Sequence, residues 1–136
     1  MAAPRLFATL PTSPADLVGQ PSLDHKRLDG RHEWQLTEKS GQKASISHKP
    51  RLITDDMAML RAAALAGVGM VQLPTFMVWQ DIEEGRLQAI LPDWEPRAAI
   101  THAVLPSRRG LLPAVRALVD FLADGCARQR LLRDSI

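Results

Sequence analysis

The chain has 136 residues, of which 46% are hydrophobic and 24% are charged, and its net charge is +2. This size and composition are typical of one globular domain with one hydrophobic core, and the small charge excludes a strong field for holding a polyanion. The single cysteine, Cys126, excludes a disulfide framework and a cysteine-rich metal site. Because no apolar stretch is long enough for a membrane span or a secretory signal, we expect a cytoplasmic protein without a membrane partner.

The first fifty residues predict short elements, because prolines and glycines interrupt this part of the chain repeatedly. A serine followed by a proline is typical of a helix start, so residues 13–17 are expected to form one helical turn. Residues 33–36 and 44–48 are expected to form short strands joined by a turn at residues 40–41.

The pattern becomes clearer from residue 51 onwards. Residues 51–54 form a short apolar run that is typical of a strand, and a helix is expected over residues 56–66. The helix start is indicated by the side-chain oxygens of Thr54, Asp55 and Asp56. Gly67 is expected to end the helix in a left-handed conformation, and an apolar strand is expected over residues 68–73. The expected apolar stripe of the helix consists of Met57, Leu60, Ala63 and Ala64.

A second helix is expected from Pro74 to Glu84, with a buried or partner-facing strip at Phe76, Trp79 and Ile82. Strands are expected over residues 86–90 and 98–105, with a turn at residues 91–94 between them. Pro113 opens the last helix, whose apolar face is expected to carry Val115, Leu118, Val119, Leu122 and Cys126. Strands that alternate with helices predict an α/β fold with a parallel or mixed sheet.

No pattern in the sequence indicates catalysis. His25, His32, His48 and His102 are scattered, without the spacing of metal ligands, and Cys126 is expected to be a buried structural residue. Asp55 and Asp56 are adjacent, so their side chains diverge on a helix and form a poor acid–base pair. Neither a nucleophile elbow nor a phosphate-binding loop occurs. We therefore predict no enzyme, no metal site and no cofactor.

The arginine-rich carboxyl-terminal part lacks the aromatic residues and motifs of a nucleic-acid interface, so no DNA-binding residue is predicted. The one binding feature is the junction between strand 51–54 and helix 56–66. Backbone N–H groups and a hydroxyl lie there at the carboxyl end of a strand, where open α/β sheets bind small ligands. The alternative is that Thr54 and Asp55 only cap their own helix.

The run from Leu52 to Pro74 closely resembles the signature of the substrate-binding domain of LysR-type regulators. In that family, a strand ends in a polar residue and Asp, an alanine-rich helix follows, and Gly-x-Gly precedes an apolar strand that ends in Leu-Pro. The segments 81–94, 102–109 and 115–122 resemble the elements that follow in the family, and residues 14–17 resemble an earlier short helix. The resemblance covers nearly the whole chain.

This resemblance implies one lobe of a fold like that of type 2 periplasmic binding proteins, with a mixed sheet flanked by helices. Residues 1–98 correspond to the second lobe, and residues 99–136 to the strand and helix that return to the first lobe. The first lobe and the winged helix-turn-helix have no counterpart. The strand and helix of residues 99–136 would then lack their usual neighbours. The effector-contacting set implied is Thr54, Asp55, Asp56, Met57 and Gly69.

The resemblance also implies a non-catalytic domain that senses a small metabolite and signals through the geometry of a homodimer or a larger oligomer. DNA would be bound only through the N-terminal domain that has no counterpart here. Relatives often carry Asn or Ser at Asp55, and the negative charge of Asp55 favours a neutral or hydrogen-bond-donating ligand over an anion. Two alternatives are an interaction module that pairs with an intact regulator without a ligand, and a small periplasmic-type solute binder.

Overall fold

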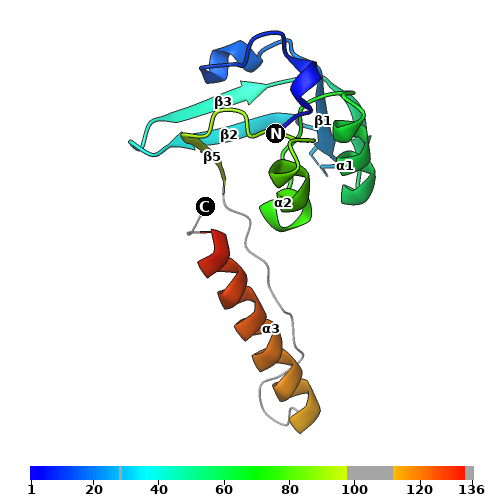
Figure 1. Ribbon diagram of the computed structural model, residues 1–136, viewed down its shortest axis with the longest axis vertical. Helices are drawn as coiled ribbons and strands as arrows, with labels where there is room; N and C mark the ends of the chain where they lie inside the picture. The colour runs from blue at the N-terminus through cyan, green and yellow to red at the C-terminus, as the bar shows by residue number, and fades with distance from the viewer. Residues whose placement is uncertain (28, 98–111, 134–136) are drawn as a thin grey trace. The chain divides into compact units, whose positions relative to one another are not determined.

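The structure is a computed structural model that describes residues 1–27, 29–97 and 112–133, with side chains described as far as residue 125. The chain divides into two compact units, Met1–Ala98 and Ala99–Ile136. The elements of the first unit, labelled in Figure 1, are the 3-10 helices η1 (Pro4–Leu6) and η2 (Pro14–Leu17), the strands β1 (Ser22–His25), β2 (Glu33–Glu38), β3 (Lys43–Ser47), β4 (Pro50–Thr54) and β5 (Trp94–Pro96), and the helices α1 (Met57–Leu65) and α2 (Thr75–Glu83).

Strands β1 and β4 form a parallel pair, with His25 opposite Thr54. Strand β4 confirms the predicted strand over residues 51–54. Strand β1 was not predicted. The expected strands 68–73 and 86–90 were wrong, because each contributes only an isolated bridge, Met70 to Ser22 and Gln88 to Ala2. The first segment still forms hydrogen bonds beside β1 and the second forms them with Ala2, but neither makes more than one bridge.

The second sheet is antiparallel, in the order β3–β2–β5. The β2–β3 hairpin, which Figure 1 shows reaching away from α1, confirms the two predicted short strands and the turn between them. Strand β5 was not predicted. It follows the expected turn, which is closed by a 2.9 Å hydrogen bond from the Trp94 N–H to the Leu91 carbonyl. One parallel and one antiparallel sheet with flanking helices confirm the mixed α/β prediction.

The two helices lie close to their predicted positions. In α1, Leu60 and Ala64 are buried as expected, whereas Met57 at the first turn is exposed. Gly67 follows α1 with a φ of +73°, a conformation that favours glycine and ends the helix. In α2 the buried side chains are Val78 and Asp81, while Phe76 and Trp79 of the expected strip lie exposed.

Strand β1 separates two hydrophobic clusters because successive side chains of a strand point to opposite faces. Leu23 packs with α1 and α2, in a cluster of Leu23, Leu60, Ala64, Val71, Val78 and Leu87. The second cluster contains Trp34, Leu36 and Ile46 of the antiparallel sheet. Ser22 and Asp24 alternate with Leu23, so their polar side chains belong to the other face of β1.

An ion-pair network around one buried carboxylate ties α1 to α2. Asp81 has no exposed side-chain surface, and its Oδ2 accepts from Arg61 Nε at 2.6 Å. Its Oδ1 accepts from Arg61 Nη2 at 2.9 Å and lies 2.8 Å from Arg86 Nη2. The hydrogen bonds from Arg61 lower the pKa of Asp81, and the positive charges of Arg61 and Arg86 act in the same direction.

Of the second unit, the structure describes helix α3 (Pro113–Arg133), which begins at the predicted proline. Its apolar side chains are largely exposed within the chain, with Leu118 at 55%, Phe121 at 67% and Leu122 at 51%. The side chain of Cys126 and the expected strand 98–105 lie outside the described residues. None of the described helices combines the length and apolar character needed to cross a bilayer.

Candidate functional site

The parallel pairing of β1 and β4 brings their carboxyl ends to one edge of the sheet. The Lys26 N–H, just after β1, donates to the Thr54 carbonyl at 3.0 Å. Helix α1 starts immediately beyond β4, so its first turn lies at the same edge. We call Thr54, Asp55, Asp56 and Met57 the junction; this kind of edge is where open α/β sheets place small ligands.

Part of the junction serves the helix itself. The Oδ1 atom of Asp56 accepts from the Ala58 N–H at 2.8 Å and from the Met59 N–H at 3.2 Å. Thr54 Oγ1 accepts from the Asp56 N–H at 3.1 Å. The capping alternative is therefore confirmed for Thr54 and wrong for Asp55, because the capping carboxylate is that of Asp56.

Asp55 and Met57 are the members of the junction that remain open. Both are exposed, and Met57 has 39% of its surface accessible. Within the described part of the chain, the Asp55 carboxylate has no hydrogen bond or ion pair, and the amides of Asp55 and Met57 have no hydrogen-bond partner. The junction thus offers two amide donors, one free carboxylate and an apolar side chain to solvent.

Gly69, the remaining candidate, is not near the junction. It is buried, and a Cβ placed on it would lie 3.0 Å from backbone atoms of Pro21 and Ser22. Those residues precede or begin β1, whereas Thr54 pairs with the end of this strand. The structure therefore gives Gly69 a packing role, allowing residues 69–71 to approach β1 closely.

A buried polar cluster that the sequence did not reveal lies on the other face of β1. We call Ser22, Asp24, His32 and His48 the histidine cluster. A 2.8 Å hydrogen bond joins Ser22 Oγ to His48 Nδ1, and His32 Nδ1 donates to Asp24 Oδ2 at 2.7 Å. The His48 side chain is only 1% exposed, and its Nε2 has no hydrogen-bond partner among the described residues.

Burial of the ring favours the neutral form of His48. Burial lowers the pKa of His48, as do the nearby His32 and Arg27, while Asp24 acts against this shift. Although serine, histidine and aspartate meet here, Ser22 has no exposed surface, so its hydroxyl cannot reach a substrate. No group of side chains suited to holding a metal occurs in the described ranges. The cluster can hold or move a proton, and we see no other chemistry in it.

The sequence carried one signal for this cluster. Ser22 and Asp24 are two residues apart, which places both on one face of a strand. His32 and His48 come from just before β2 and from just after β3, so only the folded sheet brings them to Asp24.

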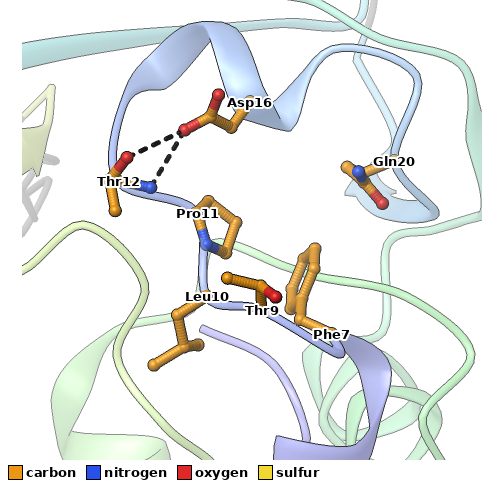
Figure 2. A pocket seen from close by; sticks show the side chains of 7 residues that line it. All are labelled: Phe7, Thr9, Leu10, Pro11, Thr12, Asp16 and Gln20. Atoms are coloured by element: carbon orange, nitrogen blue, oxygen red, sulfur yellow. Dashed lines mark hydrogen bonds between the residues drawn. The ribbon is translucent and has the colours of Figure 1, made fainter.

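One hollow of about 290 Å³ lies away from the junction, in the segment between η1 and η2. Figure 2 shows its lining of Phe7, Thr9, Leu10, Pro11, Thr12, Asp16 and Gln20. The Asp16 carboxylate already has hydrogen-bond partners, since it accepts from the amides of Thr12 and Ser13. This hollow includes none of the predicted site residues, and its Thr12 and Asp16 form hydrogen bonds at the start of η2.

Replacing Asp56 with alanine is expected to lower the free energy of unfolding by about 1 kcal/mol, because the first turn of α1 loses its cap. Asp55→Ala is the matched control and should leave the stability nearly unchanged, since its carboxylate makes no contact in the described structure. Urea unfolding followed by circular dichroism measures both changes. Equal losses in the two variants would contradict the assignment of the cap to Asp56.

A family model for the LysR substrate binding domain matches residues 1–127. The HTH-type transcriptional regulator PtxR of Pseudomonas aeruginosa is 30% identical over 131 residues, which are 95% of this chain and 42% of that protein. The HTH-type transcriptional regulator CrgA of Neisseria meningitidis is 30% identical over 117 residues, 84% of this chain and 38% of that protein. The chain spans less than half the length of these relatives.

Solved structures show the same relationship. The regulatory domain of AphB from Vibrio vulnificus matches with a TM-score of 0.60 and 27% identity, covering 68% of this chain and 47% of that one. CrgA of Neisseria meningitidis matches with a TM-score of 0.56 and 26% identity, covering 70% of this chain and 34% of that one. Fold and relatives together define a substrate-binding, regulatory type of domain found in transcriptional regulators. The chain belongs to the LysR substrate-binding domain family.

Proposed function

We propose that this chain senses a small metabolite through the junction of Thr54, Asp55, Asp56 and Met57. The observation that carries the proposal is the pair of unpartnered amides and the free Asp55 carboxylate at the carboxyl edge of the β1–β4 pair. Membership of the LysR substrate-binding domain family supports a ligand-binding role for the chain. Asp56 and Thr54 contribute by fixing the shape of the turn, while Asp55 and Met57 make the contacts.

The chemistry of the junction favours one class of ligand. An exposed carboxylate attracts hydrogen-bond donors and repels anions, and Met57 offers apolar contact beside it. A neutral or amine-bearing metabolite with hydroxyl groups would use both the Asp55 carboxylate as acceptor and the two amides as donors. A carboxylate ligand would meet the negative charges of Asp55 and Asp56.

We further propose that residues 1–98 act as the second lobe of the sensing module and residues 99–136 as the segment that returns to the first lobe. Signalling would then pass through the geometry of a homodimer in the cytoplasm, with DNA bound by a separate N-terminal domain. Exposed apolar side chains support an interface on this unit, namely Met59 at 50% and Val68 at 37% exposed, in and just after α1. The apolar face of α3 is a second surface that a neighbouring lobe or copy would cover.

A thermal-stability screen of the whole chain tests the sensing proposal. The panel contains polyols, amides, amines and carboxylates. A ligand at tenfold its dissociation constant should stabilise the chain by about 1.4 kcal/mol, and hydroxyl- or amine-bearing compounds should give the shift. Asp55→Ala should reduce the shift, whereas Asp93→Ala, an exposed carboxylate on another surface, should not. Equal shifts in both variants, or none with any compound, would contradict the proposal.

A further inference from the structure

We propose that Asp24 and the two histidines of the cluster form a proton-operated lock, which sets how firmly the chain after β1 is held beside the junction. The lock would make the junction respond to pH. Its regulatory meaning rests on the proposed sensing function, although the lock itself can be measured without any metabolite.

Three basic groups converge on one oxygen atom. Asp24 Oδ2 lies 2.7 Å from His32 Nδ1, 3.7 Å from His48 Nε2 and 3.9 Å from Arg27 Nε. The His32 bond is made, while the other two distances are longer than a hydrogen bond. One oxygen cannot serve all three groups equally, so a stronger hold by one group weakens the hold by the others.

His48 is the member of the cluster that can gain a charge while its ring stays buried. Its Nε2 is buried and has no partner in the described structure, and its ring lies 4.2 Å from that of Trp34. The titratable groups that face it are Asp24 on β1, Arg27 after β1 and His32 before β2. Since burial keeps His48 neutral at neutral pH, a proton added on acidification creates a cation whose nearest counter-charge is Asp24 Oδ2.

The positive charge on His48 alters the contacts that His32 and Arg27 make with Asp24. An imidazolium at His48 attracts Oδ2 more strongly than a neutral ring does, and His32 and Arg27 lose part of their hold on that oxygen. Lys26, between Asp24 and Arg27, donates to the Thr54 carbonyl in the junction. A change in the contacts of Asp24 on protonation of His48 is therefore transmitted to the junction through Lys26 and its hydrogen bond to Thr54.

The sign of the pH effect on stability follows from the direction of the His48 shift. A histidine whose pKa is lowered on folding stabilises the fold at pH values above its ordinary pKa of about 6.5. This stabilisation declines as the pH falls below that value, because the unfolded chain then takes up a proton more readily than the folded chain does. His48→Gln should flatten this dependence.

An NMR titration of the whole chain from about pH 7.5 to about pH 5, around the ordinary histidine pKa, tests the lock. The ring signals of His48 should titrate below their ordinary midpoint. The amide signals of Lys26, Arg27, His32 and Met57 should shift along the same curve. His48→Gln should abolish the shared shift. His25→Gln, which removes an exposed histidine at the end of β1, should preserve it at Arg27, His32 and Met57.

Two results would overturn the lock: amides that do not follow the His48 curve in the unchanged protein, or an unchanged amide titration in the His48→Gln chain. The first comparison needs no variant, so it stands even if His48→Gln folds poorly. Because no metabolite is present, failure of the sensing proposal leaves this titration intact. Conversely, if a ligand binds at the junction but the amide signals do not shift in the pH titration, only the lock is contradicted.

Discussion

Replacing Asp81 with asparagine is expected to lower the free energy of unfolding by about 2 kcal/mol, because the buried side chain loses its charge-assisted hydrogen bonds. The Asp81 carboxylate is fully buried and faces Arg61 of α1 and Arg86 beyond α2. Its loss removes the polar link between the two helices over the cluster around Leu23. Chemical denaturation at neutral pH should show a lower midpoint for the variant.

Two further measurements make this prediction specific. Asp93→Asn removes an exposed carboxylate paired with Lys39, both about two-thirds exposed, and should change the stability by less than about 1 kcal/mol. The difference in the free energy of unfolding between the Asp81→Asn chain and the unchanged chain should also become smaller as the pH falls below about 4. Arg61 lowers the pKa of Asp81, so its contribution is present above the ordinary aspartate pKa and is lost on acidification. A gap that does not depend on pH would contradict the ion-pair account.

Replacing Gly69 with alanine is expected to cost about 2 kcal/mol, a magnitude typical of forcing an extra methyl group into a packed core. The added Cβ would meet backbone atoms of Pro21 and Ser22 at 3.0 Å, and backbone cannot move aside as a flexible side chain can. Residues 69–71 would have to withdraw from β1. Thermal unfolding and amide exchange at Leu23 and Met70 would both report the loss.

Gly125→Ala is the matched control for this prediction. Gly125 lies in α3 and has no atom close to the position of an added Cβ in the described structure. Alanine there should be neutral or slightly stabilising, because it favours the helix. A Gly69→Ala chain of normal stability that had lost metabolite binding would instead assign Gly69 to the effector site and contradict the packing role.

The sequence foresaw those elements whose own residues supply strong local signals. Helix α1 was predicted because side-chain oxygens precede it, an alanine-rich stripe forms its body and Gly67 ends it. Strand β1 was missed because Ser22, Asp24 and His25 make it look like a polar connection. Its polar side chains are tolerated in the core because His32 and His48 form hydrogen bonds with them, and these partners lie beside other strands of the fold.

The candidate site also has features that the sequence predicts locally and features that depend on the fold. The position of the junction could be predicted because a strand end followed by a helix start is a local feature. Which of two adjacent aspartates caps the helix depends on backbone direction at the turn, and the sequence alone did not decide between them. Gly69 was grouped with the junction through the family signature, whereas its place at the other end of β1 required the strand pairing.

The most direct test of the sensing account is an amide chemical-shift map of the whole chain, recorded with and without a metabolite that stabilises it in the screen. The account predicts that the largest changes fall on Asp55 and Met57 and on Lys26, which is hydrogen-bonded to Thr54. Changes confined to the hollow between Phe7 and Gln20, with the junction signals unmoved, would contradict it.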